Sequence, residues 1–193
     1  MAREEARAAV PNEVMEEIDA RARELRWGIK PFLHYSGRPG NSENKFVRVA
    51  GFRDGEIDWT GTQVSERNRA NVAALQNLLD KMPKFHGTVY RGCAFEKKKD
   101  LDDYLRTLFG DPEALKGFIS TTPDPVIAHH YAASGNYKVV IVVPNSQNGV
   151  YFGPYSRHPE DEEALISYKF YLRGLKKYEK DGILYVLAEE VPR

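Results

Sequence analysis

The chain has 193 residues, 41% hydrophobic and 29% charged, which fits one globular domain and argues against a disordered chain. Its 28 Lys and Arg balance 28 Asp and Glu, so no overall basic field recruits nucleic acid or an anionic membrane. The single cysteine, Cys93, excludes an internal disulfide and a cysteine-based metal cluster, and no apolar run approaches the ~20 residues of a membrane span.

Helical patterns dominate the first half of the chain. In order, the spacing of apolar residues predicts a helix over 11–27, an irregular stretch over 28–44, two β-runs over 45–60 and a helix over 65–82. Gly28 is expected to end the first helix. Asp54-Gly55 is a hairpin signal between the two β-runs.

Short strands dominate the second half. Runs of β-branched and aromatic residues predict strands over 88–92, 118–121, 138–143, 149–152, 164–172 and 183–188. A helix is expected over 101–108, and another begins after Asp124, with Pro125 in its first turn and Gly135 at its end. Helices first and strands later predict an α+β fold rather than alternating βαβ units.

Three short motifs carry residues that could do chemistry. Arg91 and Gly92 end one predicted strand, Ser120 lies on a second, and the acids 160–163 directly precede a third. Taken singly, each has an ordinary explanation: an arginine at a strand end, a strand running into a helix cap, and a solvated acidic loop. It is the order of the three motifs along the chain that indicates a shared function.

In that order, "VYRG", "FISTT" and "DEEALI" resemble the R-S-E class of mono-ADP-ribosyltransferases, which use NAD. The family pattern is aromatic-Arg-Gly, then Phe-x-Ser-Thr-Ser/Thr, then Glu-x-Glu before hydrophobic strand residues, and the resemblance covers residues 65–190. It implies an ADP-ribosyltransferase fold, with two packed, mainly antiparallel β-sheets and N-terminal helices flanking an NAD cleft. We expect one catalytic domain over 1–193, with a helix and hairpin region at 1–62 and a catalytic core at 63–193.

The resemblance implies roles for the charged residues, and the chemistry of NAD explains why they are needed. Breaking the nicotinamide–ribose bond passes through a cation-like sugar, which the carboxylate of Glu163 would stabilise. Arg91 would bind the pyrophosphate with its forked guanidinium. Gly92 would let the backbone approach the nicotinamide amide.

The remaining residues of the implied site support these. Ser120 would orient Glu163, and Thr121 would support the strand. Tyr131, at the end of the helix after Asp124, would stack on the nicotinamide ring. The resemblance implies no metal.

The acids allow two registers. Glu163 directly precedes the hydrophobic residues, which is where the family has its catalytic glutamate. Two residues earlier the family has Glu or Gln, which helps to select the acceptor, whereas this chain has the shorter Asp161. The alternative, Glu160 with Glu162, restores Glu-x-Glu, but alternation along a strand would then set Glu162 and Glu163 on opposite faces.

The expected reaction is transfer of ADP-ribose from NAD to a macromolecule, preferably a protein side chain, with release of nicotinamide. In the loop before the acids, Tyr155 and Arg157 are candidates for target contact, and a solvated loop is an equally good explanation. A nucleic acid acceptor stays open, and an inhibitory partner would suit a bacterial toxin, effector or phage protein. Two alternatives remain, an NAD glycohydrolase and an inactive binding module of the same fold.

The expected place of action is a reducing, aqueous compartment. The N-terminal stretch mixes both charge signs and has no apolar signal-peptide core. We therefore expect a protein that acts in the cytoplasm, or one that is delivered into a target cell by a route independent of a signal peptide.

Overall fold

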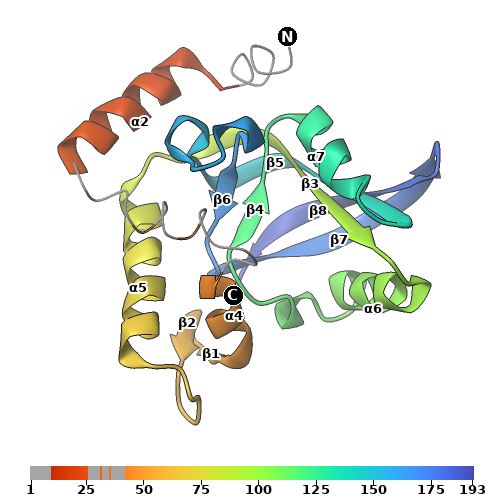
Figure 1. Ribbon diagram of the computed structural model, residues 1–193, viewed down its shortest axis with the longest axis horizontal. Helices are drawn as coiled ribbons and strands as arrows, with labels where there is room; N and C mark the ends of the chain where they lie inside the picture. Colours follow the sequence, from red (N-terminus) through yellow and green to blue (C-terminus); the bar gives the residue numbers. More distant parts are fainter. Residues whose placement is uncertain (1–9, 26–30, 32–34, 36–41) are drawn as a thin grey trace.

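The computed structural model describes residues 10–25, 31, 35 and 42–193. Its helices are α2 (Asn12–Leu25), α4 (Ser42–Val49), α5 (Glu66–Lys81), α6 (Lys98–Phe109) and α7 (Pro125–Ala132), with 3-10 turns η2 (Pro112–Ala114), η3 (Gly153–Tyr155) and η4 (Pro159–Asp161) (Figure 1). Its strands are β1 (Gly51–Arg53), β2 (Glu56–Asp58), β3 (Phe85–Phe95), β4 (Ile119–Thr121), β5 (Tyr137–Tyr151), β6 (Ala164–Ile166), β7 (Phe170–Lys180) and β8 (Ile183–Pro192). No helix in the described part of the chain could span a membrane.

Six strands form one mixed, curled sheet in the order β4-β6-β5-β8-β7, with β3 also paired to β5. The first part of β5 lies between β3, which is antiparallel to it, and β8, which is parallel. Its last residues, 149–151, pair with β6, which in turn pairs with β4. The predicted α+β fold is therefore present, but the prediction of two packed sheets is wrong, because β5 belongs to both halves of one sheet.

The unexpected length of β5 has a local cause. The sequence predicted separate strands over 138–143 and 149–152, because the residues between them are polar. In the structure the carboxylate of Glu190 accepts hydrogen bonds from the side chains of Ser146 and Asn148 and from the backbone of Gln147. These hydrogen bonds satisfy the polar groups of residues 146–148, so β5 continues through this segment.

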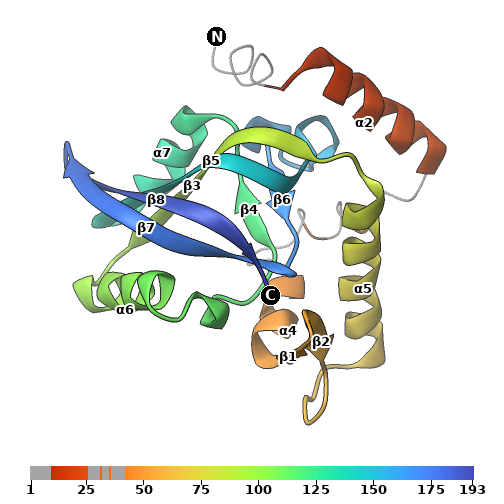
Figure 2. The same ribbon diagram turned by 180° about the vertical axis from the view of Figure 1, so that it is seen from behind.

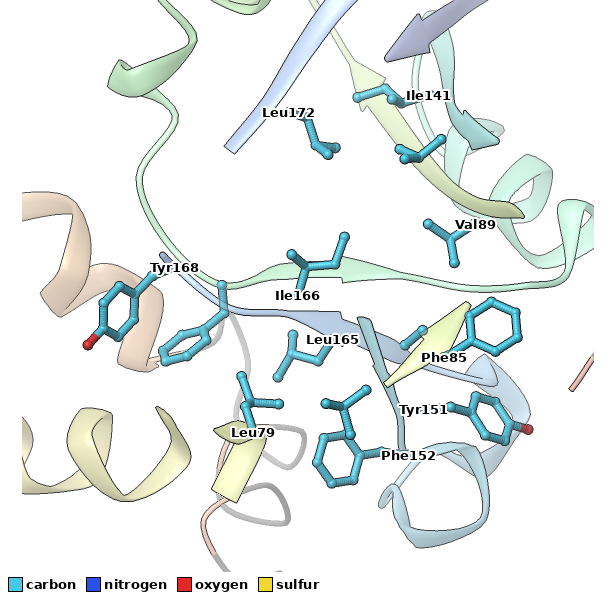
Figure 3. Packing of buried hydrophobic residues seen from close by; sticks show 14 of the residues in the cluster. Leu79, Phe85, Val89, Ile141, Tyr151, Phe152, Leu165, Ile166, Tyr168 and Leu172 are labelled. Carbon is cyan, nitrogen blue, oxygen red and sulfur yellow. The ribbon is translucent and has the colours of Figure 1, made fainter. Parts of the chain in front are cut away.

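Alternation along β5 divides the buried side chains between two faces. Val139, Ile141 and Val143 face the main core, whereas Val140 packs with α7. Side chains from β3, β5, β6 and β7 meet in the main core, among them Val89, Ile141, Leu165, Ile166 and Leu172 (Figure 3). α6 and α7 lie on opposite sides of this half of the sheet (Figures 1 and 2).

Several predicted elements are confirmed. α5 is capped by the Ser65 hydroxyl, which accepts from the Asn68 backbone at 3.4 Å. α6 and α7 lie where helices were expected, and Asp124 caps α7 by accepting from Val126 N at 2.7 Å. Asp54 and its following glycine form the turn between β1 and β2, both with positive φ. The predicted end of the first helix at Gly28, and most of the stretch 28–44, lie outside the described residues.

Two predicted strands are wrong in part. Residues 45–49 lie in α4, where Val47 is fully buried, rather than in a β-run. The predicted strand 164–172 is broken into β6 and β7 by a turn. There the Ser167 hydroxyl accepts from the Lys169 backbone at 3.0 Å and donates to Gln76 Oε1 at 2.6 Å. The Gln76 contact gives the turn a partner that lies 91 residues away in the sequence, so no local pattern could reveal it.

The last residue of the chain fixes the segment that leads into β4. The guanidinium of Arg193 donates to the backbone oxygens of Glu113 and Leu115, at 2.7 and 2.9 Å, and lies over the Phe52 ring at 4.5 Å. The C-terminus therefore lies beside α4 and the β1–β2 hairpin (Figure 2).

Candidate active site

The sheet opens between β3 and β4. Tyr90 and Thr122 exchange two backbone hydrogen bonds, at 2.8 and 2.9 Å. Beyond that pair β4 turns to β6 and β3 stays with β5, although continued pairing would set Gly92 opposite Ser120. Backbone groups two residues apart point to the same side of a strand, so Gly92 directs its N–H and C=O towards this opening.

Gly92 has a second reason to be a glycine. A Cβ at this position would lie 1.9 Å from the Ala128 carbonyl oxygen and 2.9 Å from the Ala132 nitrogen. α7 therefore packs directly on the β3 backbone. The sequence predicted a close approach to a ligand, and the structure adds a close approach to a helix.

Arg91 points away from α7 and crosses the opening. Its Nη1 donates to the Ser120 carbonyl oxygen at 2.8 Å. The guanidinium is half-buried and also contacts the Tyr104 hydroxyl of α6. Arg91 thus links β3 and β4 at the place where their backbone pairing has ended.

Glu163 lies at the mouth of the same opening. Its carbonyl oxygen accepts from Phe152 N at 2.8 Å, which fixes its backbone at the start of β6, and its carboxylate is hydrogen-bonded by Ser120. Burial raises the pKa of this carboxyl group above its usual range and nearby Asp161 adds to the rise, while the Ser120 bond and Arg91 oppose it.

The alternative acids point elsewhere. Glu162 is buried, has a left-handed backbone with φ of 44°, and accepts a hydrogen bond from the Tyr151 hydroxyl. Glu160 is exposed and lies 3.4 Å from the His158 ring nitrogen. The geometry brings Glu163 to Ser120 and turns Glu162 into the protein, which favours the first of the two registers.

The expected neighbours of Glu163 fall into two groups. Tyr131 on α7 is 47% exposed, and its hydroxyl bonds to Asp161; burial and that carboxylate raise its pKa. Thr121 does not face the opening, because its hydroxyl donates to the Ala164 oxygen at 2.7 Å and so joins β4 to β6. Tyr131 is placed for contact with a ligand, whereas Thr121 has a structural contact.

The predicted target-contact residues lie in the loop between β5 and β6. The Tyr155 hydroxyl donates to Asp19 of α2, and burial, with that carboxylate, raises its pKa to about 12. Arg157 is exposed. α2 lies next to this loop in both views (Figures 1 and 2).

Sequence reasoning missed Tyr35 and Asn44. Tyr35 is fully buried, and its hydroxyl lies 3.2 Å from Ser120 Oγ and 3.2 Å from Asn44 Nδ2. Both fall in or next to a stretch that we predicted to be irregular, where no periodicity or motif marks them. Only their contacts across the fold reveal them.

A cavity of about 290 Å³ adjoins the opening. Among the described residues that line it are three cationic side chains, Arg48, Arg91 and Lys116, together with Asn44, Tyr104 and apolar residues, and no carboxylate. Lys116 also donates to the Ala50 oxygen at 2.7 Å. The charge suits an anionic ligand. Among the described residues, no three His, Cys, Asp or Glu side chains gather into a group that could hold a metal ion.

No protein-family model matches the chain. Over 146 residues, 75% of its length, it is 31% identical to a candidate NAD(+)–arginine ADP-ribosyltransferase, Mav, of Mycobacterium avium strain 104, and it spans 15% of that relative. Among solved structures, ADP-ribosyltransferase Vis of Vibrio splendidus has a TM-score of 0.70 at 17% identity, covering 98% of this chain and 84% of Vis. Exoenzyme S of Pseudomonas aeruginosa, solved with carba-NAD, has 0.61 at 13%, covering 99% and 90%.

The opened, curled sheet is thus shared with ADP-ribosyltransferases of bacterial toxin type. The sequence likeness to Mav spans 146 residues, so the relation is not one of fold alone. The chain belongs to the ADP-ribosyltransferase family.

Proposed function

We propose that this protein is a mono-ADP-ribosyltransferase that transfers ADP-ribose from NAD to a protein side chain and releases nicotinamide. The observation that carries the proposal is the position of Glu163, hydrogen-bonded to Ser120 and within electrostatic range of Arg91 where the sheet opens. A carboxylate held there can face the ribose of a bound NAD. The local positive charge supports binding of its phosphates.

NAD would lie across Arg91. The cavity lined by Arg48, Arg91 and Lys116 would take the pyrophosphate and ADP end, because all the charged residues described in its lining are cationic. The carboxamide of nicotinamide would bond to the backbone N–H and C=O of Gly92, which point towards the opening. Tyr131 is exposed enough to stack on the ring.

In the proposed reaction, the bond between ribose C1′ and the nicotinamide nitrogen breaks, and nicotinamide leaves with the electron pair. Positive charge develops on the sugar, and the carboxylate of Glu163 stabilises it. The acceptor atom then bonds to C1′ on the opposite face and loses a proton. Asp161, beside Glu163, would take that proton from the acceptor.

The loop between β5 and β6 contains the residues that would select the acceptor. The Mav relative bears the name of an arginine-specific enzyme, which supports a guanidinium acceptor. Asp161 is one methylene shorter than the Glu or Gln that the family has at this position, so the acceptor would have to approach more closely. Tyr155 and Arg157 would then contact the surrounding protein surface.

NAD glycohydrolysis is a second candidate, because one contact favours it. The Tyr131 hydroxyl is bonded to Asp161, the carboxylate that would otherwise receive the acceptor. If that bond persists when NAD binds, water would be the readier nucleophile. Both reactions need Glu163 and release nicotinamide.

The test is incubation of the protein with labelled NAD and a bacterial lysate, comparing wild type with Glu163→Gln. Glu160→Gln is the matched control, since it makes the same chemical change on an exposed residue of the alternative register. We expect the first variant to lose at least ~10²-fold in nicotinamide release and the control to keep near-wild-type activity. Near-full activity of Glu163→Gln would contradict the proposal.

The fate of the label separates the candidates. Label that disappears on protease treatment identifies a protein acceptor, and nuclease-sensitive label identifies a nucleic acid. Nicotinamide release without label identifies a glycohydrolase. If NAD is untouched, the inactive binding module becomes the better account.

A further inference from the structure

We propose that Asn44 and Tyr35 are positioning residues that aim the Ser120 hydroxyl at Glu163 through a hydrogen-bond chain of fixed direction. The inference rests on the proposed function for its catalytic consequence. The direction of the chain, however, follows from the donors and acceptors alone.

The first link fixes the amide of Asn44. Phe118 N–H donates to Asn44 Oδ1 at 2.6 Å, and Asn44 Nδ2 donates back to the Phe118 oxygen at 3.0 Å. A backbone N–H can only donate, so the side-chain atom that it meets must be the oxygen. Space is also tight, because a Cβ on Gly117 would lie 2.7 Å from that same oxygen. The amide therefore has one orientation.

The second link assigns the proton of Tyr35. Asn44 Nδ2 also donates to the Tyr35 hydroxyl oxygen at 3.2 Å, and an amide nitrogen cannot accept. The Tyr35 hydroxyl proton must therefore go to another group. Ser120 Oγ lies 3.2 Å from the Tyr35 oxygen and is able to accept this proton.

The third link reaches the carboxylate. The Ser120 hydroxyl has one proton, and the ionised carboxylate of Glu163 can only accept, so Ser120 donates to Glu163 and accepts from Tyr35. Arg91 holds the Ser120 backbone from the other side through its bond to the carbonyl oxygen. The chain thus runs one way, from Asn44 through Tyr35 and Ser120 to Glu163.

The chain has a defined electrostatic effect. Burial and Asp161 raise the pKa of Glu163, while the Ser120 hydrogen bond, Arg91 and His158 lower it. Tyr131 and Tyr35 also lie within electrostatic range of the carboxylate. Without Tyr35, the Ser120 hydroxyl would lose the donor that fixes its rotation, and its bond to Glu163 would weaken. The pKa of Glu163 should then rise further.

The test is a double-mutant cycle on Tyr35→Phe and Ser120→Ala, read by NMR titration of the Glu163 carboxyl carbon, with Glu163→Gln to assign the signal. Tyr168→Phe is the matched control, because it removes a hydroxyl from another buried tyrosine, one that bonds to Glu56 instead. We expect Tyr35→Phe to move the Glu163 midpoint upward, Ser120→Ala to move it further, and the double variant to equal Ser120→Ala alone. The control should leave it unchanged.

A shift of equal size with and without Ser120, or no shift at all, would overturn the chain. Kinetics provide the second readout. We expect Tyr35→Phe to lower kcat for nicotinamide release roughly tenfold, with little change in KM for NAD. The acid limb of its pH profile should move to higher pH, because the protonated carboxyl group is inactive. If the NMR cycle holds while wild type does not turn over NAD, the chain stands and the proposed function fails.

Discussion

The two sides of the opening are built by different means. On the proposed NAD side, Arg91 and Gly92 lie within the long β3–β5 ladder, and Ser120 lies on a strand paired to β6. On the proposed acceptor side, the loop 153–162 contains two 3-10 turns and is held by side-chain bonds such as those of Tyr155 to Asp19 and of Tyr151 to Glu162. Ladder positions tolerate little displacement, while loops can vary without disturbing the scaffold. The donor geometry is thus fixed by the fold, and the acceptor geometry is open to change.

The largest expected effect is on the ladder side, at Gly92. Gly92→Val would press its side chain into the α7 backbone, 1.9 Å from the Ala128 oxygen at Cβ alone. We expect the free energy of unfolding to fall by about 3 kcal/mol or more, measured by urea denaturation. Gly51→Ala is the control, since its added Cβ would make ordinary contacts at 3.7 Å, and it should change stability by no more than about 0.5 kcal/mol. Equal losses in both variants would show that the packing of α7 on β3 is not what demands glycine.

An intermediate effect is expected at Arg91. Arg91→Lys keeps the positive charge but loses the forked geometry and at least part of the link across the opening. We expect the affinity for NAD, measured by calorimetry, to fall roughly 10- to 100-fold. Arg157→Lys makes the same change in the acceptor loop and should leave NAD affinity unaltered. A larger loss for Arg157→Lys would reverse the assignment of the two sides.

The smallest effect is expected at the hydrogen bond that joins Asp19 of α2 to Tyr155 in the loop between β5 and β6. Asp19→Ala removes the acceptor of the Tyr155 hydroxyl, so the loop gains freedom while the NAD side is untouched. We expect transfer to a protein acceptor to fall severalfold and NAD hydrolysis to stay constant. The pKa of Tyr155, about 12 in the native protein, should fall, because loss of a neighbouring anion favours the phenolate.

Glu17→Ala, on the exposed face of the same helix, is the control for that variant. Spectrophotometric titration of the tyrosines would report the pKa change. If Asp19→Ala lowered hydrolysis and transfer equally, the hydrogen bond between Asp19 and Tyr155 would support the whole site. The proposed difference between the two sides of the opening would then be wrong.

The sequence predicted well where local signals and tertiary packing agree. Asp124 caps α7 as expected, and the order of the three motifs predicted that Arg91, Ser120 and Glu163 would meet. It failed at residues 45–49, because an apolar run of that length fits a strand as well as a helix, and the burial of Val47 decided the outcome.

The rest could not be read from sequence because distant partners determine it. Glu190 accepts hydrogen bonds from the polar middle of β5, and Gln76 accepts one from Ser167 in the turn between β6 and β7. Tyr35 gains its place in the candidate site only through a contact with a residue 85 positions later. The roles of the site residues stay predictions until the variants are measured.

The sharing of β5 between the two halves of the sheet affects how the chain can fold. β5 pairs with β3, earlier in the sequence, and with β8, whose paired residues run to Leu187 near the end. During synthesis, the edge of β5 that pairs with β8 therefore stays unpaired until residues 183–187 have emerged. Pairings between such distant segments form slowly, because loop closure must precede the contacts that reward it. We expect slow, all-or-none folding, with a nascent form that would need protection from aggregation until β8 is made.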